Sequence, residues 1–236
     1  MMGALALAGG IAKPAQAYPL DFPTPRSHPL PPTLSRYSPP HTEHYFEHIK
    51  PSHLGYLLWS DFPITVYIET APEMTEAIAK QKQMQVWGRS VRAALQDWSL
   101  YLPLVETSQV ATADIAVYQR EPPLGSERDP HTGLVRLGRA RNAQTRYSFY
   151  LTPESPPRLK HRMAIEIKPG LGEQSILATA RHELGHALGL WGHSPYRDDS
   201  LYFSSIHFSP PISPRDLNTL ILLYQQPTQI GWPLPR

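Results

Sequence analysis

Two histidines towards the C-terminus have the spacing of a metal site. His182 and His186 are four residues apart. In a helix such residues lie on one face, one turn apart. Both imidazoles would then point at one ion. Zinc accepts imidazole nitrogens at ~2.0–2.1 Å in tetrahedral geometry, and a catalytic site keeps one position for water. The spacing therefore predicts a zinc site on a helix.

A carboxylate beside these histidines is placed for proton transfer. Glu183 directly follows the first histidine, so its side chain can reach the metal-bound water instead of the metal. Bound zinc lowers the pKa of that water to about 7. Glu183 can then take the proton and pass it to a leaving amine. We therefore expect Glu183 to be the general base of a hydrolase.

A third ligand is expected just beyond a glycine. Gly189 follows His186 by three residues, and glycine adopts positive φ readily and commonly ends helices. A helix that ends there can turn the chain back towards the metal, which makes His193 the expected third ligand. The alternatives for this position are Asp198, Asp199 and His207.

The whole run from His182 to His193 resembles the metzincin signature His-Glu-x-x-His-x-x-Gly-x-x-His. The words His-Glu-Leu-Gly-His-Ala-Leu-Gly-Leu are typical of the matrixin branch, here of the secreted bacterial type. The resemblance implies a zinc-dependent endopeptidase. It also implies a fold with a five-stranded sheet, a long first helix, an active-site helix and a C-terminal helix.

The similarity continues to Tyr224. Ser194 follows the third histidine, and the family's Leu-Met-Tyr turn is matched by Ser200-Leu201-Tyr202. By resemblance, Leu201 and Tyr202 belong to the floor beneath the metal. The Pro-rich wall segment is matched at residues 210–213, where Pro211 and Ile212 would bound the pocket beyond the scissile bond.

Two departures from the family pattern leave a second function open. Gly192 places His193 one residue later than the family spacing, and Leu201 replaces methionine. Glycine has the conformational freedom to absorb an insertion, and leucine is similar to methionine in volume. The alternative is a catalytically inactive metzincin-like domain that binds zinc and serves in interactions. The intact Glu183 favours the enzyme.

Patterns of apolar residues predict an α/β (α+β) domain with a mixed twisted sheet of about five strands. A loop is expected over 121–133. An edge strand in the 145–167 region would pair with an extended peptide. Strands are expected at 62–69, 104–107, 115–118, 135–137, 145–151 and 163–167, and helices at 72–100, 173–188 and 214–224, the last capped by Ser213.

Three regions are expected along the chain. Residues 1–17 are apolar and end in a small-x-small site, which indicates a signal peptide, although no basic residue precedes the apolar run. Residues 18–56 are rich in proline and are expected to be an arm or linker that builds no core. Residues 57–236 would form the catalytic domain. The mature chain would then be secreted or extracytoplasmic.

Composition narrows the partners and cofactors. With 22 basic and 20 acidic residues, the net charge of +2 implies neither nucleic acid nor an anionic membrane. The absence of cysteine excludes disulfides and thiol chemistry. We expect a monomer without a membrane span, acting on a peptide or protein. Residues 121–133 lack the family's pattern for structural zinc, whereas calcium is left open because backbone carbonyls could complete a site.

Overall fold

The computed structural model describes residues 21–70, 78–124, 126–128, 132–137, 141–203 and 210–235. The expected signal peptide lies outside these residues. A one-turn 3-10 helix covers Phe46–His48. The α-helices are α1 (Pro32–Ser35), α2 (Ile78–Ser99), α3 (Glu173–Ala187) and α4 (Pro214–Tyr224). The predicted start of α2 at Pro72 also falls outside the described residues.

Five strands form one mixed sheet in the order β2-β1-β3-β7-β6. The first four are parallel to their neighbours, and β6 runs antiparallel to β7. The α/β class and the five-stranded mixed sheet are confirmed. The strands are β1 (Ile64–Ile68), β2 (Leu104–Thr107), β3 (Ile115–Gln119), β6 (Ala143–Leu151) and β7 (Leu159–Ile167).

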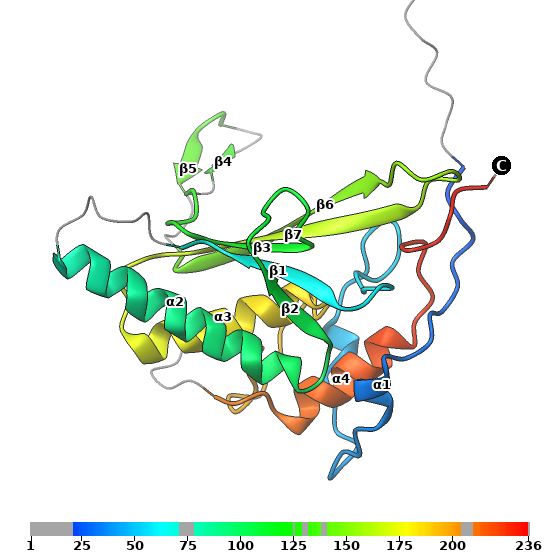
Figure 1. Cartoon of the computed structure of the whole chain (residues 1–236), viewed down its shortest axis with the longest axis horizontal. Helices are drawn as coiled ribbons and strands as arrows, with labels where there is room; N and C mark the ends of the chain where they lie inside the picture. The colour runs from blue at the N-terminus through cyan, green and yellow to red at the C-terminus, as the bar shows by residue number, and fades with distance from the viewer. Residues whose placement is uncertain are drawn as a thin grey trace, which may run out of the picture.

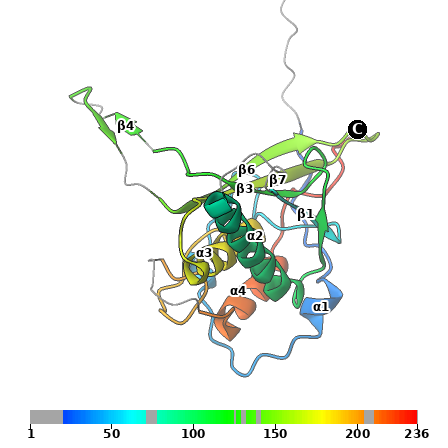
Figure 2. The same cartoon turned by 60° about the vertical axis from the view of Figure 1, so that its left-hand side comes forward.

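The helices lie on one side of this sheet, with α2 and α3 next to it and α4 farther away (Figures 1 and 2). The strand sequences explain why this face is covered. Ile64, Val66 and Ile68 alternate along β1 and are fully or almost fully buried, as expected for a strand with one face in the core. Trp98 links α2 to α3, since its indole N–H donates to the carbonyl of Arg181 on α3 at 2.9 Å.

One expected loop contains a strand. β4 (Ser126–Arg128) lies within residues 121–133 and pairs antiparallel with β5 (Val135–Leu137). This small hairpin stands apart from the main sheet (Figure 2). The prediction of a loop was therefore wrong for β4. The strand predicted at 135–137 exists, but it pairs locally instead of extending the main sheet.

The Pro-rich segment is part of the domain, which corrects the expectation of a linker that builds no core. Leu34, Tyr45, Ile49 and Leu54 are at most 4% exposed, and the first three belong to the main core. The segment runs beside the C-terminal residues (Figure 1), where Arg26 pairs with Thr228. The prediction was made from the proline content of the segment. Proline does not prevent the apolar residues between the prolines from being buried.

The C-terminal helix begins as predicted. The Ser213 hydroxyl accepts a hydrogen bond from the Asp216 N–H at 3.0 Å, and Asp216 Oδ2 accepts one from the Ser213 N–H at 2.9 Å. This reciprocal pair is a capping box. Among the described helices, none has the combination of length and apolar character that crossing a membrane requires.

Candidate metal centre

Three imidazoles meet at the end of α3. His182, His186 and His193 each offer a nitrogen, and these atoms all lie within 4.8 Å of one another. The Nε2 atoms of His182 and His186 are 3.0 Å apart. Within the described part of the chain, no other group of three His, Asp or Glu side chains comes this close together. The sequence-predicted ligand set is thus assembled at one point.

A glycine ends α3 and turns the chain. Gly189 has a φ of +114°, a conformation that favours glycine. The Leu190 N–H donates to the Gly185 carbonyl and the Gly189 N–H to the His186 carbonyl, each at 3.0 Å. These two bonds make a Schellman motif. Because a Cβ on Gly189 would lie 2.2 Å from the Leu57 carbonyl oxygen, this position requires glycine for space as well as for φ.

Backbone carbonyls fix the orientation of two imidazoles. The Nδ1 atom of His182 lies 2.9 Å from the Ser200 oxygen, and that of His186 lies 2.7 Å from the Leu190 oxygen. A carbonyl only accepts hydrogen bonds, so each Nδ1 carries the hydrogen. Each Nε2 is therefore left with its lone pair in the neutral ring, which is the arrangement of a metal-ligating histidine.

The pKa of each of the three rings is lowered. Desolvation lowers the pKa of His182 to about 4, helped by the neighbouring His186 and His193. Desolvation likewise lowers the pKa of His186 to about 4. The pKa of His193 is also lowered, first by burial and then by the positive charge of Lys50. A neutral imidazole is the form that binds a metal.

The carboxylate next to the cluster is held by a threonine. Glu183 is 8% exposed, and its Oε2 accepts a hydrogen bond of 2.6 Å from Thr145 Oγ1. Burial raises the pKa of Glu183, and the bonds from Thr145 oppose that shift. The sequence predicted a strand around Thr145. It contained no signal that this one residue of β6 would meet Glu183 on α3.

Leu201 lies beneath α3. A Cβ on Gly185 would come within 2.6 Å of Leu201 Cδ2, so the helix backbone rests directly on this leucine. The turn that presents it is closed by the Ser194 N–H, which donates to the Leu201 carbonyl at 2.7 Å. Tyr202 forms an isolated parallel β-bridge with Ser194, and its half-buried ring packs against Phe203. Leu201 thus lies directly under the backbone of α3, and its expected place in the floor beneath a bound metal stays a prediction.

The alternative third ligands are not brought to the cluster in the described part of the chain. Asp199 is buried and engaged elsewhere, since its carboxylate accepts from the Ser194 hydroxyl and pairs with Arg215 at 2.9 Å. Asp198 is exposed, and His207 lies outside the described residues. Of these candidates, the structure places His193 beside His182 and His186.

The expected wall segment adjoins α3 and leads into α4. The Pro210 carbonyl accepts from Arg181 Nη1 at 3.2 Å. Ile212 packs against the core, whereas Pro211 is exposed. Residues 204–209, which precede this segment, lie outside the described residues, so the pocket expected at Pro211 and Ile212 stays a prediction.

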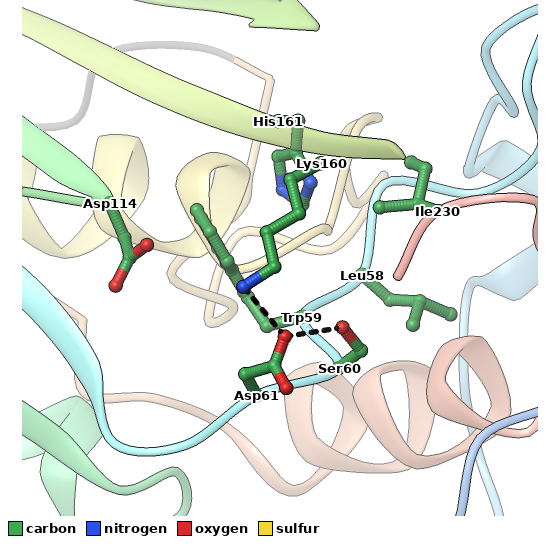
Figure 3. Close-up of a pocket in the computed structure, with 8 residues that line it drawn as sticks. All are labelled: Leu58, Trp59, Ser60, Asp61, Asp114, Lys160, His161 and Ile230. Carbon is green, nitrogen blue, oxygen red and sulfur yellow. Dashed lines mark hydrogen bonds and ion pairs between the residues drawn. The ribbon is translucent and has the colours of Figure 1, made fainter. Parts of the chain in front are cut away.

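A separate cavity, partly open to solvent, lies at the start of β7, and none of the predicted site residues lines it. Its most buried polar lining residue is His161, which is 1% exposed and contacts Trp59 with tilted rings whose centroids are 4.1 Å apart. Neither ring nitrogen has a hydrogen-bond partner in the described structure. Lys160 and Asp61 form a 3.0 Å ion pair in the same cavity (Figure 3).

The sequence matches no protein-family model and no curated protein. Arguments about function therefore depend on the residues and geometry of this chain.

Proposed function

We propose that this chain is a zinc-dependent endopeptidase. One observation carries the proposal: three imidazoles converge on one point, and a buried carboxylate follows the first of them in the same helix. A structural metal site would need the three histidines but not Glu183. A hydrolase needs both a metal and a general base.

The donor set suits zinc. Tetrahedral geometry with Zn–N of ~2.0–2.1 Å separates two ligand nitrogens by roughly 3.3 Å, and the His182 and His186 Nε2 atoms are 3.0 Å apart. Imidazole also suits copper, iron and nickel, so the metal needs a direct assay. When bound, zinc polarises the scissile carbonyl and lowers the pKa of the attacking water.

The chain's own groups would handle the proton. The Glu183 carboxylate accepts it from the water and delivers it to the leaving amine. Thr145 holds Oε2 of that carboxylate, which limits the orientations that Glu183 can adopt. Thr145 is thus a positioning residue for the general base.

Strand β6 supports an extended peptide as substrate. It is an edge strand of the five-stranded sheet, so one side of its backbone is available for pairing in the manner of an added strand. It also carries Thr145, which ties this edge to Glu183. A peptide paired along β6 would lie beside the histidine cluster. The signal peptide expected at residues 1–17 would direct this activity outside the cytoplasm.

The proposal is tested by comparing Glu183→Gln with Glu173→Gln, an exposed acid in the first turn of the same helix. Zinc content and cleavage of a broad peptide library are measured by mass spectrometry. We expect Glu183→Gln to bind zinc fully and to lose activity by about 100-fold or more, while Glu173→Gln behaves as wild type. If zinc-loaded wild type cleaves no peptide, the inactive zinc-binding interaction domain becomes the better account.

A further inference from the structure

The loop that carries His193 is held by the main chain of residues 48–50. A Cβ on Gly192 would lie 2.1 Å from the His48 carbonyl oxygen and 3.1 Å from the Ile49 Cα. The Lys50 N–H donates to the Trp191 carbonyl at 3.0 Å. The two residues that precede His193 are therefore fixed by a segment about 140 positions earlier in the sequence.

Tyr45, three residues before His48, is linked to His182 through a buried chain of hydrogen bonds. The Tyr45 hydroxyl donates to Asp216 Oδ1 at 2.6 Å. Asp216 Oδ2 accepts from both the N–H and the hydroxyl of Ser200, each at 2.9 Å. The Ser200 carbonyl in turn accepts from His182 Nδ1. Both Tyr45 and Asp216 are 0% exposed, so water does not compete for these bonds.

Side chains of α4 hold the backbone of residues 41–45. The Tyr45 N–H donates to Thr219 Oγ1 at 3.0 Å. The Asn218 side-chain amide donates to the carbonyls of His41 and Glu43, both at 2.8 Å. Residues 41–50 therefore contact both α4 and the loop that carries His193.

We propose that residues 45–50 are a positioning segment for the metal ligands. The proposal rests on the proposed zinc centre, but it concerns how the ligands are held, not what the centre does. Gly192, the extra residue in the loop that carries His193, lies against His48. Tyr45 stabilises the turn at Ser200, whose carbonyl orients His182. Residues beyond the ligands that fix their orientation commonly contribute 10–100-fold to metal affinity. Metal affinity of this chain then depends on a segment that contributes no ligand.

The decisive variant is Gly192→Ala in the full-length chain, because its Cβ cannot be accommodated without moving His193 or the backbone of His48. The matched control is Gly172→Ala, where an added Cβ meets no atom within 4 Å. The zinc dissociation constant is measured by chelator competition, and the visible spectrum of the cobalt-substituted protein reports the ligand geometry. We expect Gly192→Ala to weaken zinc binding by about 10–100-fold with an altered cobalt spectrum, and Gly172→Ala to change neither.

A milder variant keeps the proposal testable if Gly192→Ala does not fold. Tyr45→Phe removes only the hydroxyl that donates to Asp216, and Tyr37→Phe removes one from a ring that packs on Tyr101. We expect roughly tenfold weaker zinc binding for Tyr45→Phe and no change for Tyr37→Phe.

The outcomes separate this proposal from the proposed function. Wild-type affinity and an unchanged cobalt spectrum in Gly192→Ala would overturn it, as would unchanged affinity in Tyr45→Phe if only that variant folds. A wild type that binds zinc but cleaves nothing would remove the peptidase and leave the positioning role in place. A wild type that binds no zinc would overturn both.

Discussion

Thr145 Oγ1 lies 2.6 Å from Glu183 Oε2 and joins the edge strand of the sheet to the proposed general base. Thr145→Val keeps the shape of the side chain and removes the donor. We expect kcat/KM to fall about tenfold, because losing one such hydrogen bond in the transition state costs ~1.4 kcal/mol, with zinc content unchanged. Thr145→Ser retains the hydroxyl and should stay close to wild type. Full activity in Thr145→Val would show that Glu183 does not need this bond.

The contact between Gly185 and Leu201 predicts a favourable coupling in a double-mutant cycle. An alanine in place of a helical glycine gains about 1 kcal/mol. In wild type, its Cβ would meet Leu201 Cδ2 at 2.6 Å and Trp98 Cζ2 at 3.1 Å, and such overpacking costs about 1–3 kcal/mol. Gly185→Ala should therefore be neutral or destabilising in wild type. In the Leu201→Ala background only the Trp98 contact remains, so the same change should be less unfavourable than in wild type.

Urea unfolding of the four proteins of this cycle measures the coupling. Leu201→Ala alone should cost about 2–5 kcal/mol, as expected for a leucine with 0% exposure. We expect the double variant to be more stable than the sum of the two single changes by about 0.5–3 kcal/mol. Strict additivity would mean that the floor can move away from α3 at no cost.

Local signals predicted the parts of the fold that are built from local contacts. Ser213 and Asp216 are three residues apart, and their capping box starts α4 where the sequence placed it. His182 and His186 share a helix face for the same reason. At Gly189 α3 ends, and the N–H groups of Gly189 and Leu190 donate to carbonyls three and five residues earlier than themselves, respectively. In each case the sequence near the residue contains the physical cause.

The parts that the sequence missed depend on partners far along the chain. Tyr45 is 171 residues from Asp216, and Thr145 is 38 residues from Glu183. No periodicity or capping signal indicates either pair. Proline content favoured a linker for residues 18–56, because the burial of Leu34 and Tyr45 depends on core residues far along the chain.

Burial of Leu34 predicts that the Pro-rich segment contributes to stability. Leu34 is 1% exposed in the main core, so Leu34→Ala should lower the free energy of unfolding by about 2–5 kcal/mol. Leu100→Ala, at a position that is 71% exposed, should change it by no more than about 0.5 kcal/mol. Urea unfolding of both variants checks this. Equal, small effects would mean that residue 34 belongs to a detached arm.

Buried His161 predicts how stability changes in acid. Burial lowers the pKa of this imidazole from 6.5 to about 3. Between these two values the unfolded chain binds a proton that the native protein does not, so stability falls as the pH is lowered through this window. One such proton contributes a slope of up to about 1.4 kcal/mol per pH unit. His161→Phe removes this contribution and fills the site with a ring that needs no hydrogen bond.

Urea unfolding of wild type and His161→Phe is measured from about pH 7.5 down to about pH 4, a range that covers most of this window. It gives the slope of the free energy of unfolding against pH for each protein. Both proteins keep His182, His186 and His193, so the titration of these residues cancels in the comparison. We expect the wild-type free energy of unfolding to fall more steeply in acid than that of the variant. At the neutral end, His161→Phe should be close to wild type or more stable, because it removes two buried nitrogens without partners in the described structure. Parallel curves would show that His161 takes up its proton in the native protein and that its cavity admits the charge.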